Sequence, residues 1–307
     1  MTKNKRWGKK YVDKRDWKVY NSQLVKRGQI LIDIKFAMSW DSELEKMNAN
    51  KIGKPYEFPE SLIKFQAVLH AKRVPYRMIQ GVCMELHEIA GLRNYCNYTT
   101  TNRRVNKTST ELALPNGENL TLFADGGSFQ VVEGGEYLRA KYGKKNRKWV
   151  QIVFWGDPES KEPVSFDINI VQDSEVESAK RQIQTLKEIK KVSIIEAGGD
   201  GGFDDMELWN WLWSNGIWPN IKPDKNAKEN SDSQIRNRMV KERNRLGYKK
   251  WAKKHGYGYR WPATEGILSA VKRIFGEQVH AKSEIGMIQE AKVKFWAYQK
   301  LKRYGEA

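Results

Sequence analysis

The chain has few cysteines, no long apolar run and fewer acidic than basic residues, and each shortage excludes a class of protein. Cys83 and Cys96 are its only cysteines. They match no disulfide framework and no zinc-ligand spacing, so we expect reduced thiols in a cytosol. The sequence has no run of about 18 apolar residues, and its basic start lacks the apolar segment of an export signal. We therefore expect a soluble, cytoplasmic protein with no membrane partner.

The net charge is strongly positive but unevenly distributed along the 307 residues, which are enough for two domains. Residues 1–112 carry a net charge of +11, residues 113–240 carry −3, and residues 241–307 carry +10. Basic flanks suit a polyanion such as DNA, and an acidic centre concentrates carboxylates where chemistry could occur. The simpler alternative is that the charge only keeps the protein in solution.

Residues 1–112 are predicted to form a helical domain that binds DNA or pairs subunits. Helical segments at 58–71 and 75–90 precede a short turn and a third segment, in which a capping hydroxyl is followed by basic residues. This pattern is typical of a helix-turn-helix. The basic residues of the third segment that would contact DNA are Arg103, Arg104 and Lys107. A plain helical hairpin with a solvated basic face predicts the same pattern, and the role of residues 1–60 stays open.

Residues 113–307 change to a strand-like period and are predicted to form an α/β domain with a mixed sheet. Strands are expected at 120–124, 149–155 and 164–172, and short turns would join them into an antiparallel meander. An amphipathic helix, a strand, a tryptophan-rich helix and a further strand follow. The expected order is therefore three strands and then alternating helices and strands.

Two aspartates are expected at the ends of strands, and two glycines follow each of them. Asp125 would end strand 120–124, and Asp200 follows a strand predicted at 192–197. A right-handed crossover would place these strands side by side, so that both carboxylates meet at one edge of the sheet. Glycine allows a ligand to approach closely. For each aspartate alone, a simple turn residue is an equally good interpretation.

A third carboxylate, Glu265, lies on a helix predicted to stop at Gly276. An apolar stripe would pack this helix on the sheet and leave Glu265 and Lys272 on its polar side, although a solvated charged face is the alternative. Three converging carboxylates repel one another unless cations neutralise them, and oxygen donors suit Mg²⁺ or Mn²⁺. Two such ions, held by Asp125, Asp200 and Glu265, would serve phosphodiester chemistry.

The C-terminal block resembles that of DDE-type insertion-sequence transposases, in the fourth and fifth groups and most closely the fifth. In the family the block has the form Tyr-x2-Arg-x3-Glu-x6-Lys. Here Tyr257-x2-Arg260 and Glu265-x6-Lys272 fit, with four residues rather than three between Arg260 and Glu265. The interval of 65 residues from Asp200 to Glu265 is too short for the large β insertion of fourth-group relatives.

The resemblance implies an RNase H-like catalytic domain at residues 113–307 behind the helix-turn-helix-like region. It implies a prokaryotic, nucleoid-associated homodimer that binds terminal inverted repeats, nicks double-stranded DNA and joins the freed 3′-hydroxyl to target DNA. The catalytic residues would be Asp125, Asp200, Glu265, Lys272, Arg260 and Tyr257. The lysines that would neutralise the DNA backbone nearby are Lys250, Lys253 and Lys254. Two alternatives remain, namely a nuclease without strand transfer and a DNA-binding protein that has lost catalysis.

Overall fold

A mixed sheet lies at the centre of the computed structural model, which describes residues 5–6, 9–10, 15–115, 119–132, 149–170 and 173–307. The strand order is β5-β4-β3-β6-β7, and β8 pairs with the far end of β3. β3, β4 and β5 are antiparallel neighbours, whereas β6 and β7 run parallel to β3. This order and these directions are those of an RNase H-like sheet. The strands are β3 (Asn119–Val131), β4 (Trp149–Asp157), β5 (Glu162–Asn169), β6 (Ser193–Gly199), β7 (Trp218–Ile221) and β8 (Gln278–Val279).

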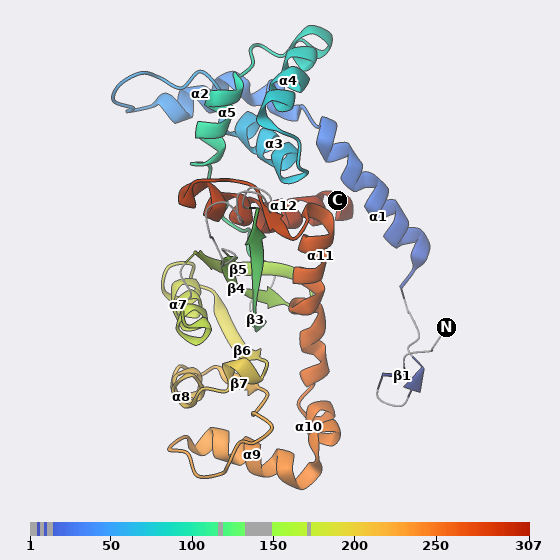
Figure 1. Cartoon of the computed structure of the whole chain (residues 1–307), viewed down its shortest axis with the longest axis vertical. Helices are drawn as coiled ribbons and strands as arrows, with labels where there is room; N and C mark the ends of the chain where they lie inside the picture. The colour runs from blue at the N-terminus through green and yellow to red at the C-terminus, as the bar shows by residue number, and fades with distance from the viewer. Residues whose placement is uncertain (1–4, 7–8, 11–14, 116–118, 133–148, 171–172) are drawn as a thin grey trace, which may run out of the picture.

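Helices cover both faces of the sheet because its strands alternate between two apolar cores. On β4, Val153 and Trp155 face the core formed with α7 and α8, whereas Ile152 and Phe154 face the core formed with α11 and α12. Figure 1 shows α7 and α8 on one side of the sheet and α11 on the other. These helices are α7 (Glu175–Glu188), α8 (Met206–Ser214), α11 (Glu265–Phe275) and α12 (Glu284–Glu306).

The N-terminal region is helical, as predicted, and its helices begin and end at recognisable residues. Pro75 precedes α4, and Gly91 ends it in the left-handed conformation with φ 65°. The side chain of Asn97 caps α5 by accepting a hydrogen bond from the Thr100 amide. These helices are α1 (Trp17–Gln29), α2 (Trp40–Asn48), α3 (Glu60–Ala71), α4 (Tyr76–Ala90) and α5 (Tyr98–Val105). The short strands β1 (Lys5–Arg6) and β2 (Lys9–Lys10) pair with each other.

α12 connects the N-terminal helices to the sheet. It packs against α1 and α3 on one side and against β4 and β5 on the other, and Figure 1 shows it between the two regions. Gln299 exchanges two hydrogen bonds of 2.8 Å with the backbone of Ala113, in the segment between the regions. One apolar core therefore spans both sides of the predicted boundary at residue 112, and that boundary stays a prediction.

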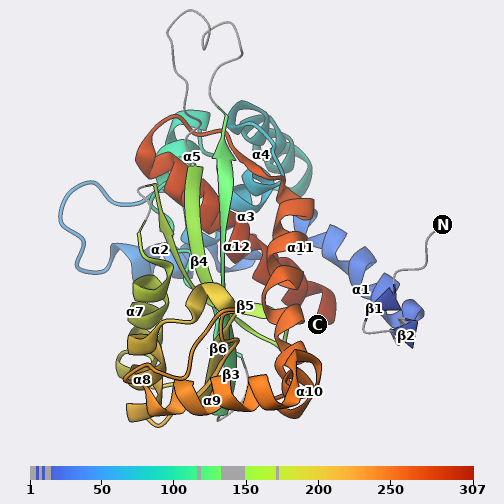
Figure 2. The ribbon, with the colours of Figure 1, turned by 60° about the horizontal axis from the view of Figure 1, so that its bottom comes forward.

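Further helical segments position the C-terminal part of the chain. The helices α9 (Gln234–Leu246) and α10 (Tyr248–Lys254) cross the end of the sheet below β6 and β7 (Figure 2). The 3-10 helices are η1 (Ile30–Ile32), η2 (Lys35–Ser39), η3 (Gly201–Phe203) and η4 (Tyr257–Ala263). Among the described residues, no helix has the length and apolar character needed to cross a bilayer.

The expectation that Asp125 ends a short strand is wrong. β3 continues past it to Val131, because β4 pairs with it continuously from Phe123↔Gly156 to Gln130↔Trp149. The parallel pairing of β3 with β6, by contrast, ends at Phe123. Asp125 therefore lies in the middle of β3, just beyond the point where its neighbour β6 stops. The expected side-by-side arrangement of these two strands is confirmed.

Candidate active site

Asp200 is the first residue beyond β6, next to the part of β3 that carries Asp125. Its side chain accepts a hydrogen bond of 2.8 Å from the amide of Gly202, which fixes the start of η3. β6 and β3 are parallel neighbours up to Phe123. Both aspartates thus lie just beyond the point where the parallel pairing of β3 with β6 ends. Asp200 lies outside β6, whereas Asp125 lies within the longer strand β3.

Two glycines allow α11 and η4 to pack closely on the sheet. A Cβ atom added at Gly127 would lie 2.7 Å from the Leu268 side chain, and one added at Gly156 would lie 1.9 Å from the backbone oxygen of Ala263. Gly127 lies two residues after Asp125, so both residues are on the same face of β3. Close packing at these glycines therefore places the start of α11, at Glu265, over the face that carries Asp125.

Glu265 is held by residues of η4 and by the threonine before it. Arg260 Nη2 donates to Glu265 Oε1 at 2.7 Å, and its Nη1 donates to the hydroxyl of Thr264 at 3.1 Å. That hydroxyl also contacts Glu265 Oε2. Thr264 is a site residue that sequence reasoning missed, because nothing in the Thr264–Glu265 dipeptide distinguishes it from an ordinary helix start. Thr264 and Arg260 together fix the glutamate in one position.

Tyr257 links this block to the strand that leads to Asp200. Its hydroxyl donates to the backbone oxygen of Gly199 at 3.3 Å. The guanidinium of Arg260 lies 5.4 Å from the centre of the Tyr257 ring, a cation–π contact. The structure thus brings Tyr257, Arg260 and Glu265 together with the end of β6.

The electrostatic environment of Asp125 couples the three predicted carboxylates. Its pKa is raised from 3.8 to about 7, mainly by burial and then by repulsion from Glu265, with a smaller contribution from Asp200; Arg260 partly offsets these effects. Burial also acts to raise the pKa of Glu265, but hydrogen bonds from Thr264 and from its own backbone amide, with the charge of Arg260, lower it overall. The surroundings of Asp125 therefore disfavour its negative charge, and a bound cation would offset that effect.

The residue types fit a hard divalent cation, although their present arrangement is not that of a preformed metal centre. Within the described part of the chain, no three acidic, histidine or cysteine side chains are grouped so that they could hold a metal ion. Glu265 is instead paired with Arg260. The three side chains supply only oxygen donors, the type that Mg²⁺ and Mn²⁺ prefer.

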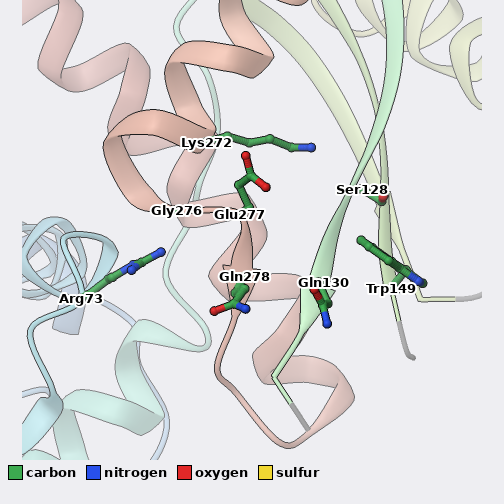
Figure 3. Close-up of a pocket in the computed structure, with 8 residues that line it drawn as sticks. All are labelled: Arg73, Ser128, Gln130, Trp149, Lys272, Gly276, Glu277 and Gln278. Atoms are coloured by element: carbon green, nitrogen blue, oxygen red, sulfur yellow. The ribbon is translucent and has the colours of Figure 1, made fainter. Parts of the chain in front are cut away.

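Lys272 is separated from this cluster. It lies seven residues after Glu265 on α11, which is about 10 Å along a helix. It faces a pocket of about 340 Å³ at the far part of β3, between the sheet and the turn after α3 (Figure 3). The residues lining that pocket are Arg73, Ser128, Gln130, Trp149, Lys272, Gly276, Glu277 and Gln278. Two cations and an indole thus line the pocket.

The three basic residues predicted to bind DNA on α5 and just after it differ in what they contact. Arg103 and Lys107 are exposed. Arg104 is largely buried, pairs with Glu60 at 3.1 Å and lies 4.5 Å from the centre of the Tyr56 ring. These contacts give Arg104 a structural role between α3 and α5.

The lysines predicted near the active site lie on α10, which leads directly into η4. Lys250 and Lys253 are exposed. Lys254 is also exposed but pairs with Glu242 of α9, which His255 contacts at 2.6 Å as well. Of these three lysines, Lys250 and Lys253 lie at the surface of α10, whereas Lys254 joins α10 to α9.

Comparisons with known proteins identify a related family. A family model described as "Transposase DDE domain" matches residues 116–299, more than half of the chain, and a second model with that description matches residues 25–133. Among solved structures, the chain is similar to the piggyBac transposase in a synaptic complex with hairpin DNA, at 10% identity and a TM-score of 0.28. The match covers 68% of this chain and 52% of that one, so the chain spans about half of that transposase's length. No curated protein matches.

Proposed function

The chain belongs to the transposase DDE domain family, and from this premise we propose that it is a DNA transposase of an insertion sequence. It binds the terminal inverted repeats of its element, cleaves phosphodiesters there and transfers the freed 3′-hydroxyl to target DNA. The observation that carries this proposal is the environment of Asp125, a partly buried carboxylate whose pKa is raised by burial and by the charges of Glu265 and Asp200. A shifted pKa within a cluster of ionisable side chains is more typical of a catalytic site than of a structural one.

Asp125, Asp200 and Glu265 are the residues that would hold two Mg²⁺ ions, or Mn²⁺ in their place. When bound, such ions activate a water or hydroxyl and stabilise the leaving oxygen of a phosphodiester. Glu265, now paired with Arg260, would hold the cation, and the guanidinium of Arg260 would then be available to a DNA phosphate. Its contact with the Tyr257 ring would keep Arg260 near the site.

The basic flanks of the chain supply the DNA contacts in this proposal. Arg103 and Lys107 on the N-terminal side, and Lys250 and Lys253 on α10, are exposed cations suited to phosphate oxygens. Lys272 neutralises phosphate charge beside the pocket that it lines. Two ends are processed together by a homodimer associated with the nucleoid.

A cleavage assay tests the proposal on DNA fragments that carry the inverted repeats bordering the gene. With Mg²⁺, the wild-type protein is expected to nick the fragment at the repeat, and Asp200→Ala to abolish the nick. The loss should exceed about 100-fold, because even groups that only orient a metal ligand change activity by about 10–100-fold. Asp232→Ala is the control, since Asp232 is exposed in the segment before α9.

A second matched pair tests the glutamate. Glu265 and Glu284 are both exposed first residues of helices that lie against the same core. Glu265→Gln should lose cleavage, whereas Glu284→Gln should retain it. Nicking without joining of a 3′-hydroxyl end to a target plasmid would instead identify a nuclease. Specific binding without Mg²⁺-dependent nicking would identify a DNA-binding protein.

A further inference from the structure

Asp204 is a buried carboxylate, four residues after Asp200, to which none of the roles above applies. Its side chain is 2% exposed. Oδ1 accepts hydrogen bonds from Arg236 Nε at 2.8 Å and from the Trp209 indole at 2.9 Å. Oδ2 accepts from Arg236 Nη2 at 2.8 Å and from the amide of Asp224 at 2.7 Å. Four donors, two of them from one planar guanidinium, hold this carboxylate in a single orientation.

The donors to Asp204 come from separate elements of the domain. Trp209 is on α8, Arg236 is in the first turn of α9, and Asp224 lies in the segment between β7 and α9. Arg236 is itself 13% exposed and also donates to the backbone oxygen of Lys228 at 3.4 Å. The ion pair therefore ties α8 and α9 to the turn that leaves β6; Figure 2 shows these elements at the same end of the sheet.

The turn between Asp200 and Asp204 is short and internally bonded. The backbone amide of Phe203 donates to the backbone oxygen of Asp200 at 3.1 Å, and the backbone amide of Asp204 donates to the backbone oxygen of Gly201 at 3.3 Å. The ring of Phe203 is buried against Gly199, where an added Cβ atom would lie 2.7 Å from it. These contacts link the backbone of Asp204 to that of Asp200 through a single short turn.

We propose that the Asp204–Arg236 ion pair is a positioning device that sets the affinity of the active site for divalent cations. It fixes the turn so that the carboxylate of Asp200 stays beside Asp125. Asp204 is not itself a ligand, since its two oxygens already accept four hydrogen bonds. This inference rests on the proposed function, because it takes Asp200 as a metal ligand.

Mn²⁺ binding, measured by electron paramagnetic resonance on the full chain, tests the inference without requiring activity. Arg236→Lys keeps the positive charge but removes the two-pronged contact. The matched control is Arg303→Lys, because Arg303 on α12 donates to the 3%-exposed Glu162 at 2.8 Å, away from the turn. We expect Arg236→Lys to weaken Mn²⁺ binding about tenfold or more, as for other groups that orient metal ligands, and Arg303→Lys to leave it unchanged.

Further measurements separate positioning from a loss of folding. Circular dichroism and the unfolding temperature are recorded for both variants, which should be destabilised to a similar extent. If Arg236→Lys does not fold, Asp204→Asn replaces it, since the amide keeps the shape and one acceptor oxygen of the carboxylate. Raised Mn²⁺ should restore cleavage by the Arg236→Lys variant, because the ligands themselves are intact.

The outcomes distinguish this inference from the proposed function. If the wild-type protein binds Mn²⁺ and Asp200→Asn loses it, while Arg236→Lys and Asp204→Asn bind as the wild type does, the positioning role is overturned and the proposed function stands. If Asp200→Asn binds Mn²⁺ as well as the wild type, the metal site itself is refuted. Weaker binding confined to the Asp204–Arg236 variants supports the inference.

Discussion

Asp125→Asn is expected to make the protein inactive and, at the same time, more stable above neutral pH. The wild-type carboxylate has a pKa of about 7 instead of 3.8, because it is partly buried and is repelled by Glu265. At about 1.4 kcal/mol per pKa unit, the difference corresponds to about 4 kcal/mol of unfavourable free energy for the charged form. Solvent screening of this partly buried group reduces the expected gain to about 2 kcal/mol.

The sign of the pH dependence follows from proton binding. Between about pH 4 and pH 7 the folded protein holds a proton on Asp125 that the unfolded chain has released. The stability of the wild type therefore falls through this window as pH rises, and stays lower above it. Asparagine does not titrate, so the advantage of the variant is absent near pH 4 and complete near pH 8.

Thermal unfolding of both proteins at several pH values, without divalent cations, measures this effect. For a chain of this size about 2 kcal/mol raises the unfolding temperature by roughly 4 °C. Asp232→Asn, at an exposed position, should change it little at any pH. The raised pKa of Asp125 would be contradicted if Asp125→Asn were less stable than the wild type at pH 8, or if it changed the unfolding temperature equally at pH 5 and pH 8. Added Mg²⁺ should stabilise the wild type more than Asp125→Asn.

Two further comparisons use matched neighbours. Gly156→Ala should lower the free energy of unfolding, measured by chemical denaturation, by about 3 kcal/mol, because its new Cβ would lie 1.9 Å from a backbone oxygen. Gly127→Ala should lower it by only about 1 kcal/mol, because its Cβ would meet the end of a leucine side chain. Equal losses of stability in the two variants would contradict the packing described. Arg104→Ala should lower stability by about 1–3 kcal/mol, because it removes the cation from the partly buried Glu60. Arg103→Ala should change the free energy of unfolding by no more than about 0.5 kcal/mol. In fluorescence anisotropy, it should reduce the slope of log K for DNA binding against log salt concentration by about one. Loss of folding in Arg103→Ala would refute its surface role.

Elements bounded by local signals could be predicted from the sequence. Pro75 and Gly91 delimit α4 as expected, and Gly276 ends α11 with φ 83°. The strand before Asp200 and its parallel pairing with the strand of Asp125 followed from apolar runs and the handedness of crossovers. These features depend on a few adjacent residues or on general chain geometry.

Features that depend on distant partners could not be predicted. β3 extends past Asp125 because β4 supplies partners for the glycines, which by themselves indicate a turn. α12 gives no amphipathic stripe, because it is enclosed on several sides and buries polar residues such as Gln299 and Lys294 along with apolar ones. Arg104 has the sequence context of a DNA contact, but Glu60 lies within reach only in the folded chain.

The central claim is that Asp125, Asp200 and Glu265 together bind divalent ions for phosphodiester cleavage. The most direct test counts Mn²⁺ ions bound per chain in the presence of end DNA, for the wild type and for the triple variant Asp125→Asn, Asp200→Asn, Glu265→Gln. We predict about two ions in the wild type and none in the triple variant at the same Mn²⁺ concentration. Equal numbers of bound ions in the two proteins would contradict it.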